Sequence, residues 1–292
     1  MPELPEVETI ARGLAKRVTG DIIESVWIGQ KKEPLKSSAR EIARTLEHSC
    51  ILSVRRMGKH IVFDLEPTHK SAGPRRRPGK GPTSVRSASA QGTVSKAHWI
   101  VHLGMTGSLR ICEPQAELAK HTHAILKLAS GRELRFVDPR RFGRLSVSAA
   151  FEATGVEPLE VSVDRFVSLF RGRKTPIKSA LLNQKLLRGV GNIYADESLF
   201  RAGIRPRRRA SSITREQLAK LYAALQEVLT EAIALGGSSI SDYVDANGEE
   251  GFFQLQHRVY GRETEPCLVC KTPIKRVIIA GRSSHYCPTC QK

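Results

Sequence analysis

The segment CLVCKTPIKRVIIAGRSSHYCPTC, residues 267–290, decides how the end of this chain folds, because its cysteines follow the spacing C-x2-C-x16-C-x2-C. Each pair can bind one metal ion from a tight turn while the chain between them returns as a hairpin. Four thiolates in a closed tetrahedron favour one structural Zn2+ and leave no open position for catalysis. The ligands would be Cys267, Cys270, Cys287 and Cys290. Iron bound by the same four sulfurs is the alternative.

The residues around these cysteines are basic. Residues 267–292 contain no Asp or Glu and carry five cations, namely Lys271, Lys275, Arg276, Arg282 and Lys292. Such a segment suits phosphate groups better than a protein partner. Taken alone, it would support a nucleic-acid-binding module with no enzymatic activity.

The whole chain is also basic, with 47 Lys plus Arg against 29 Asp plus Glu and a formal net charge of +18. Clustered cations release counterions from a phosphate backbone, so this excess favours a polyanionic partner. The sequence has no long apolar run and no apolar segment after a basic N-terminal stretch, so we expect neither a membrane span nor secretion. Close cysteine pairs indicate metal in a reducing compartment.

Two periodicities divide the rest of the chain. Short apolar and β-branched runs between residues 21 and 145 predict strands, which together imply a sandwich or barrel. The expected strands are 22–29, 51–57, 60–65, 98–104, 123–129 and 132–138. Helical spacing dominates from about 150 to 235. The expected helices are 164–172, 179–187, 192–203 and 213–237, the last ending at Gly236 and Gly237.

Residues 67–96 interrupt the predicted strands with a segment rich in Pro, Gly, Ser and Ala. It contains no acid and seven cations, namely Lys70, Arg75, Arg76, Arg77, Lys80, Arg86 and Lys96. This composition predicts a disordered basic loop inserted between two strands. It is either an extra electrostatic contact with DNA or a tolerated surface insertion, since long loops add little closure entropy.

At the other end of the chain, residues 2–18 predict a helix whose apolar residues recur at helical spacing, namely Val7, Ile10, Leu14 and Val18. Removal of Met1 would expose the secondary amine of Pro2. A free α-amino group titrates near ~7.7 to 8.0, so part of it is neutral and nucleophilic at pH 7.

Attack of such an amine on a sugar C1′ displaces the base and leaves an iminium ion, which acts as an electron sink. Glu3 and Glu6 lie beside Pro2, where a carboxylic acid could protonate the departing base or the opened sugar. The simpler interpretation is that these residues only start a helix.

The opening MPELPEVE and six further motifs in the same order resemble the formamidopyrimidine-DNA glycosylase family of base-excision repair. The motifs are MGKHIVFDL (57–65), HLGMTGSLR (102–110), DPRRFG (138–143), LLNQKLLRGVGNIYADESLFRAGIRP (181–206), VYGRETEPCLVC (259–270) and GRSSHYCPTCQK (281–292). The resemblance implies an α+β multidomain fold. Its parts are an N-terminal catalytic β-sandwich with a leading helix over 1–149, a helical helix-two-turn-helix DNA-binding domain over 150–258, and a zinc-finger β-hairpin over 259–292.

The resemblance also implies the catalytic residues. Pro2 matches the family's nucleophile, Glu3 its general acid, and Glu6 a further carboxylate of the site. Lys59, in a turn between strands, would donate a proton in strand cleavage. Arg282 matches the arginine that grips phosphates around the lesion.

Seven residues are implied as DNA contacts. Met105, Arg140 and Phe142 match the triad that fills the gap left by an extruded base, with Arg140 facing the orphaned cytosine and Phe142 wedged beside it. The alternatives are core packing for Phe142 and a salt bridge with Asp138 for Arg140. The backbone contacts would be Lys178 and Asn192, which we expect at a helix N-cap. His121 matches a further DNA-contact position, and Arg173 stands in place of a family lysine that contacts DNA.

The implied activity is that of a bifunctional glycosylase and abasic-site lyase, which excises 8-oxoguanine and formamidopyrimidines from double-stranded DNA. A Schiff base on Pro2 would undergo β- and then δ-elimination. We expect a monomer in the bacterial cytoplasm, at the nucleoid. Residues 238–253 are expected to close over the flipped base, but their sequence does not rank the two lesions.

Three other interpretations stay open. An enzyme like endonuclease VIII would remove oxidised pyrimidines with similar machinery, although Leu4 and the DPRRFG motif favour the purine branch. A silent DNA-binding module would need only the turn motif and the zinc finger, and the presence of Pro2, Glu3 and Lys59 argues against it. A basic RNA-binding protein should show no preference for damaged DNA.

Overall fold

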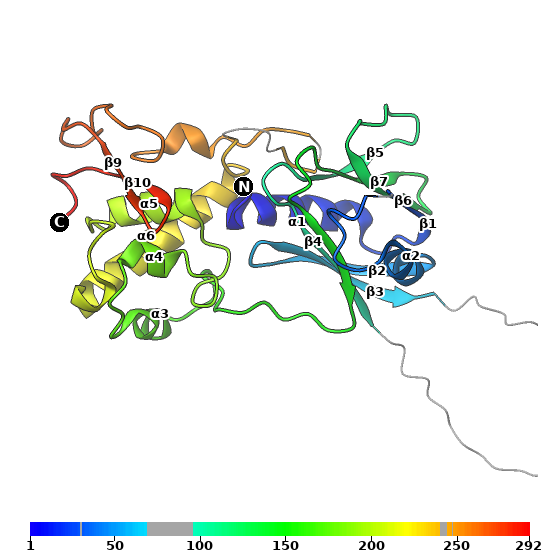
Figure 1. Cartoon of the computed structure of the whole chain (residues 1–292), viewed down its shortest axis with the longest axis horizontal. Helices are drawn as coiled ribbons and strands as arrows, with labels where there is room; N and C mark the ends of the chain where they lie inside the picture. Colours follow the sequence, from blue (N-terminus) through cyan, green and yellow to red (C-terminus); the bar gives the residue numbers. More distant parts are fainter. Residues whose placement is uncertain (30, 69–95, 240–243, 247) are drawn as a thin grey trace, which may run out of the picture.

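The computed structural model describes the chain except residues 30, 69–95, 240–243 and 247. A β-rich half and a helical half lie side by side, and a two-stranded hairpin packs against the helical half (Figure 1). This arrangement confirms the predicted α+β fold of sandwich, helical domain and hairpin. Among the described helices, none is both long and apolar enough to cross a membrane.

The β-rich half is a sandwich of two four-stranded antiparallel sheets. The first sheet has the order β1–β6–β7–β5, formed by β1 (Ile23–Ile28), β6 (Thr122–Leu128), β7 (Glu133–Val137) and β5 (Ser108–Cys112). The second sheet has the order β2–β3–β4–β8, formed by β2 (Ser49–Met57), β3 (His60–Pro67), β4 (Ala97–His102) and β8 (Arg144–Ser148). All six predicted strands are present, whereas β5 and β8 were not predicted.

The core of the sandwich is closed by large side chains. Phe63, Trp99 and Phe136 are fully buried in one cluster with the apolar face of the N-terminal helix. The rings of Phe63 and Trp99 lie 4.7 Å apart at a tilt. Burial of each such side chain stabilises the fold by roughly 1.5–3 kcal/mol.

The N-terminal helix α1 (Leu4–Val18) joins the two halves. Its predicted apolar face packs into the sandwich core, whereas Leu4 at its first turn packs into the core of the helical half. Ala246, which follows α6 in the chain, is conversely buried in the sandwich core. The two halves therefore share side chains across the boundary expected at residue 149.

A second helix, α2 (Ala39–Leu46), lies within the region for which only strands were predicted. Ser38 caps it by accepting a hydrogen bond from the Glu41 amide at 3.1 Å. Ile42 and Leu46, four residues apart, bury its inner face. The helix is two turns long, so its apolar periodicity is too short to stand out among the strand runs.

The helical half contains α3 (Val163–Phe170), α4 (Ile177–Leu181), α5 (Asn192–Arg201) and α6 (Arg215–Ala234), with short 3-10 turns at Ala210–Ser212 and Phe253–Gln256. Three predicted helices match α3, α5 and α6, and α6 is followed by Gly236 and Gly237 with φ of 75° and 86°.

The helix predicted over 179–187 is wrong, because α4 ends at Leu181. Two polar side chains bond to the backbone after it. Asn183 Oδ1 accepts from the Lys185 amide, and the Gln184 amide group donates to the Leu182 and Val190 carbonyls. These bonds favour a turn over a continued helix.

The hairpin pairs β9 (Lys275–Ile279) with β10 (Arg282–Tyr286) in antiparallel register. The predicted insertion over 67–96 falls between β3 and β4, which are neighbouring antiparallel strands. Residues 69–95 of it lie outside the described residues.

Candidate active site and DNA interface

A cleft of about 680 Å3 is lined by residues from both halves, including the first residues of the chain. In Figure 1 the N-terminus lies between the β-rich half and the helical half. The cleft is lined by the start of α1, the β2–β3 turn, the β4–β5 loop, the loop before α5 and the hairpin tip. Seven residues predicted for the site line it together, namely Pro2, Glu3, Glu6, Lys59, Met105, Asn192 and Arg282. The structure therefore joins all five predicted catalytic residues.

Glu3 is held against the N-terminus of α5. The Ile193 amide donates to Glu3 Oε1 at 3.3 Å, and the Leu4 amide donates to the Gly189 carbonyl at 3.0 Å. A Cβ at Gly191 would lie 2.0 Å from the Glu3 carboxyl carbon. Only glycine at position 191 lets the carboxyl reach the positive end of α5.

Burial raises the pKa of the Glu3 carboxyl to about 7, against the opposing effect of the Lys59 ammonium. Its Oε2 is buried and has no hydrogen-bond partner among the described residues. A carboxyl that is partly protonated at neutral pH, with one unbonded oxygen beside a cleft, is suited to donate a proton.

Glu6 is bonded on both oxygens. Oε2 accepts from the Glu3 amide at 2.8 Å, and Oε1 accepts from the Ser238 amide at 2.8 Å and from the Tyr194 hydroxyl. Burial raises the pKa of Glu6, while these donors oppose the rise. The contacts tie the chain end to α5 and to the segment after α6, so Glu6 fixes the position of its neighbours.

Lys59 lies in the tight turn between β2 and β3. Gly58 has a φ of 62°, a conformation that favours glycine. Burial lowers the pKa of Lys59, and the nearby Arg282 contributes to the lowering. The amine is thus easier to deprotonate than a solvated lysine, as a group that exchanges protons requires.

An ion-pair network lies behind this turn and was not predicted. Arg56 pairs with Glu8 at 2.6 Å and with Glu157 at 2.7 Å, and it donates to the Gly58 carbonyl at 3.2 Å. Arg188 also pairs with Glu157, at 3.2 Å. These residues connect α1, β2 and the chain that leads into the helical half.

The predicted void-filling triad lies on two adjoining loops. Met105 is 36% exposed and Phe142 is 50% exposed, so Phe142 is not a core residue. The Arg140 guanidinium stacks 4.7 Å from the Phe142 ring centre. Buried Asp138 accepts from Thr106 Oγ1 at 2.6 Å and from the Gly143 amide at 2.7 Å, and these bonds join the two loops.

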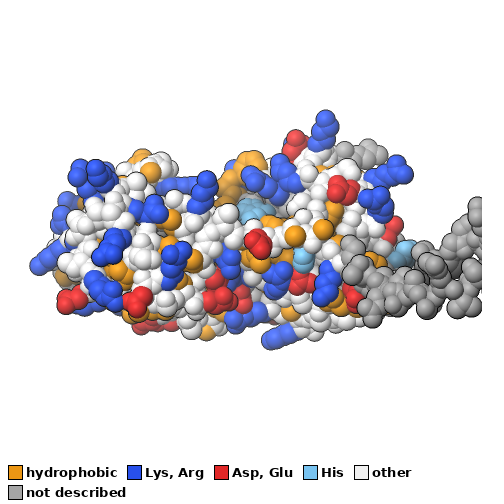
Figure 2. Space-filling model, turned by 90° about the horizontal axis from the view of Figure 1, so that it is seen from below, with side chains coloured by type: hydrophobic (Ala, Val, Ile, Leu, Met, Phe, Trp, Pro, Cys, Tyr) orange, Lys and Arg blue, Asp and Glu red, His pale blue; other side chains and the backbone are white. Residues whose placement is uncertain are grey.

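The predicted backbone contacts are more dispersed. Asn192 lines the cleft but is the first residue of α5, with Gly191 as its N-cap. His121 is exposed at a separate hollow on the sandwich. Arg173 is exposed after α3, where its Nε donates to the Leu169 carbonyl at 2.5 Å, and it does not line the cleft. Lys and Arg side chains spread over both halves of the face in Figure 2.

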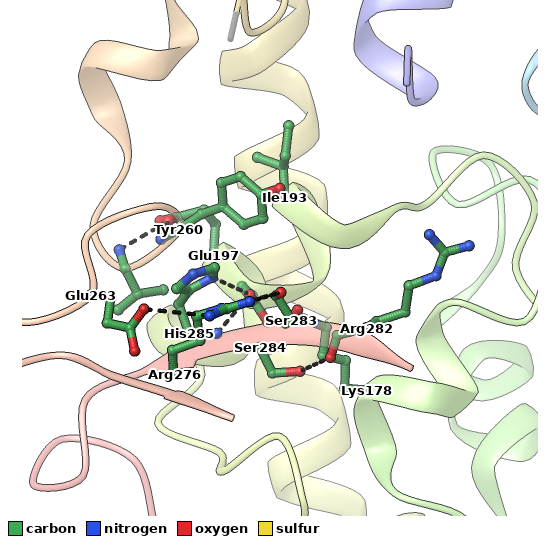
Figure 3. Close-up of polar contacts among 12 residues, drawn as sticks. Lys178, Ile193, Glu197, Tyr260, Glu263, Arg276, Arg282, Ser283, Ser284 and His285 are labelled. Carbon is green, nitrogen blue, oxygen red and sulfur yellow. Dashed lines mark hydrogen bonds and ion pairs between the residues drawn. The ribbon is translucent and has the colours of Figure 1, made fainter. Parts of the chain in front are cut away.

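Lys178 is buried beneath the hairpin (Figure 3). Its Nζ pairs with Asp196 at 2.6 Å and donates to the Ser283 carbonyl at 2.6 Å. Asp196 also accepts from the His285 amide at 2.9 Å. The pair anchors β10 to α5, and the side chain of Arg282, one residue before Ser283, extends away from this cluster.

Glu197, next along α5, anchors the approach to the hairpin. Its carboxylate is fully buried and accepts from the amides of Arg258, Val259 and Tyr260 at 2.8–3.0 Å. One helix thus presents two acids to the hairpin side.

Among the cleft-lining residues that were not predicted, two carry an ionisable ring, namely His102 and Tyr260. Burial, together with nearby cations, lowers the pKa of His102 to about 4, and its Nδ1 accepts from the Gly104 amide at 3.0 Å. A neutral imidazole follows at pH 7. Both residues belong to motifs that carry the family resemblance, HLGMTGSLR and VYGRETEPCLVC. That membership is the sequence feature that could have marked them as candidates for the site.

The four predicted cysteine ligands converge at the base of the hairpin, with their sulfurs all within 4.8 Å of one another. Two of the separations, Cys270–Cys287 and Cys267–Cys290, are 3.4 and 3.9 Å. A tetrahedron with Zn–S bonds of ~2.3 Å has edges of about 3.8 Å. The donor set therefore fits Zn2+ bound by four thiolates.

Comparison with known proteins gives consistent matches along the chain. Family models match the formamidopyrimidine-DNA glycosylase N-terminal domain over residues 1–145, its H2TH domain over 154–244, and the zinc finger found in FPG and IleRS over 265–292. The last match, with the four-cysteine cluster, confirms the predicted structural zinc.

Curated relatives named formamidopyrimidine-DNA glycosylase are 48% identical in Solibacter usitatus and 41% identical in Gluconobacter oxydans, with full coverage of both chains. The solved MutM (Fpg) protein of Thermus thermophilus is 39% identical, with a TM-score of 0.80 and 99% and 98% of the two chains covered. A Lactococcus lactis Fpg mutant in complex with Fapy-dG DNA is 30% identical, with a TM-score of 0.84 and full coverage of both chains.

The close approach at Gly191 yields a first test. Gly191→Ala should expel the Glu3 carboxyl from its buried position, and its pKa should fall from about 7 towards the ordinary value of ~4.3. Carbon-13 NMR titration of the glutamate carboxyls measures this shift. Gly29→Ala is the control, since its Cβ would meet its nearest neighbour at 3.5 Å. An unchanged Glu3 pKa in Gly191→Ala would contradict the close fit.

The buried Lys178–Asp196 pair yields a second test. Lys178→Met should lower the free energy of unfolding by roughly 3–5 kcal/mol, because it leaves the Asp196 carboxylate uncompensated. The double variant Lys178→Met/Asp196→Asn should recover part of the loss. Urea unfolding of the zinc-loaded protein measures both, with exposed Lys174→Met as the control. Wild-type stability together with weaker salt dependence of DNA binding would instead place Lys178 on the DNA.

Proposed function

Because the chain belongs to the formamidopyrimidine-DNA glycosylase family, we propose that it excises oxidised purines from double-stranded DNA with Pro2 as its nucleophile. The observation that carries this proposal is the buried Glu3 carboxyl, with a pKa of about 7, directly beside Pro2 on the cleft. Relatives in complex with Fapy-dG DNA and with carbocyclic 8-oxo-G DNA support the lesion class.

Removal of Met1, which is 49% exposed, precedes the reaction and frees the amine of Pro2. The neutral amine of Pro2 attacks C1′ of the extruded nucleotide, the bond from C1′ to the base breaks, and the sugar ring opens to an iminium ion. Glu3 supplies the proton that the departing base or the opened sugar takes up. The iminium then accepts electrons in β- and δ-elimination, which leave a one-nucleotide gap with phosphate ends.

The remaining residues position the DNA in this proposal. Lys59 donates a proton during strand cleavage, and Arg282 and Asn192 grip phosphates at the rim of the cleft. Met105, Arg140 and Phe142 occupy the gap left by the extruded base, and their exposure on one pair of loops supports this role.

The contacts outside the cleft have two roles. His121 and Arg173 contact the DNA directly, and Lys178 acts through the hairpin that it anchors. The structural zinc holds that hairpin and takes no part in the chemistry. We further propose that the protein works as a monomer at the bacterial nucleoid, divided at residues 149 and 258.

Two alternatives receive less support. The full-length relatives are named formamidopyrimidine-DNA glycosylase. Their names, together with Leu4 and the DPRRFG motif, favour an enzyme for oxidised purines over an enzyme like endonuclease VIII. A silent binding module has no use for a buried carboxyl that is half-protonated at neutral pH, next to an amine and a desolvated lysine.

Trapping with borohydride tests the nucleophile. The full-length protein is incubated with a duplex that carries 8-oxoguanine opposite cytosine, and borohydride should reduce the Schiff base to a covalent adduct that maps to Pro2. Extension of the N-terminus by one Gly–Ser pair should abolish the adduct while DNA binding persists. Tight binding without any adduct in the unextended protein would favour the silent module.

The pKa of Glu3 predicts the alkaline limb of the pH profile. Because this pKa is raised, the proton is present below about pH 7 and lost above it. Single-turnover base excision should therefore decline as pH rises through 7. Glu3→Gln should remove this limb and slow excision by ~10^2-fold or more. Glu24→Gln, an exposed carboxyl on β1, is the control, and a limb that survives in Glu3→Gln would assign it to another group.

A further inference from the structure

A second hollow of about 450 Å3 lies on the sandwich, apart from the catalytic cleft. The described residues that line it include no acid. Those that bear charge or an aromatic ring are Trp27, Lys31, Lys120, His121, His123 and Arg141. Lys31, Lys120 and Arg141 are exposed. Three cations in a concave site, with no acid among the described residues that line it, suit a phosphate group.

Trp27 gives the hollow an aromatic wall. It lies on β1, the edge strand of its sheet, and is 50% exposed, whereas Trp99 is fully buried in the core. Because half of the Trp27 side chain is exposed, packing in the sandwich core does not explain why a tryptophan occupies this position. An exposed indole beside phosphate-binding cations is typical of surfaces that stack on nucleotides.

The hollow adjoins the loop that carries Arg140 and Phe142. Pro139 and Arg141 line the hollow, while the Arg140 guanidinium between them stacks on Phe142. Arg141 has a φ of 58°, a left-handed conformation at the turn of this loop. The hollow therefore lies directly beside the loop that would hold the duplex through Arg140 and Phe142.

We propose that this hollow binds a nucleotide of the strand opposite the lesion, next to the orphaned cytosine. Lys31, Lys120 and Arg141 hold its phosphate, and Trp27 packs against its sugar and base. The opposite strand is assigned because Arg140, adjacent to Arg141, faces the orphaned base in the proposed function, on which this inference rests.

The test measures binding to a duplex with an unreactive tetrahydrofuran abasic analogue, so that it does not depend on catalysis. Trp27→Ala should raise Kd about fivefold or more, and Trp27→Phe should restore part of the affinity. Lys31→Ala and Lys120→Ala should each reduce the slope of log Kd against log salt by up to ~0.9, the value for one neutralised phosphate. Lys220→Ala, exposed on α6 and outside both hollows, should leave the slope unchanged.

Neutral methylphosphonate linkages identify the strand. Placed opposite the lesion, beside the orphaned base, they should weaken binding by the wild type more than binding by Lys31→Ala, which has already lost one of the three cations that hold this phosphate. Equal further loss in both proteins, or loss only with linkages in the lesion strand, would overturn the assignment. So would wild-type affinity and salt slope in the Trp27 and lysine variants.

Fluorescence gives an independent readout, because the chain has two tryptophans and Trp99 is fully buried. A DNA-induced change in emission should occur in the wild type and disappear in Trp27→Phe. Persistence of the change in Trp27→Phe would contradict the contact. Failure of the proposed function is recognised separately, by the absence of a borohydride adduct at Pro2 in a protein that binds the abasic duplex normally.

Discussion

The site depends on the contact between the first residues of the chain and the N-terminus of α5. Burial of Glu3 against Gly191 and Ile193 raises its pKa, shapes one wall of the cleft and places Pro2 at the junction of the two halves. A charged carboxylate would be costly in this position, and the positive end of α5 offsets only part of that cost. The chemistry and the interface between the halves therefore rest on the same contact.

Much of the fold could be predicted from periodicity and motifs. Long apolar runs identified six strands, α1 and α6, because burial repeats within each element. The short elements β5, β8 and α2 were missed, since pairing and packing with distant segments stabilise them more than their own sequence does. The helix expected over 179–187 failed because the side chains of Asn183 and Gln184 bond to the backbone.

The site was predicted by resemblance rather than by local pattern. Motifs identified every catalytic candidate in the cleft, but they carried no information on tertiary partners. The buried pair of Lys178 with Asp196 and the Arg56–Glu157 network could not be predicted. A charged residue in a sequence is expected to be exposed to solvent, and only the tertiary structure shows which oppositely charged residue it pairs with. Likewise, His102 and Tyr260 stood inside motifs without a feature that marked them for the cleft.

Helix α1 contributes side chains to the cores of both halves. Its 15 residues form a rod about 22 Å long, with Leu4 in one core and the apolar residues from Val7 to Val18 in the other. The amine of Pro2, the proposed nucleophile, is thus positioned by a helix that is anchored in the sandwich interior. Loosened packing around Leu14 or Val18, in the sandwich core, would therefore displace the proposed nucleophile, so a change that affects packing alone would resemble a catalytic defect.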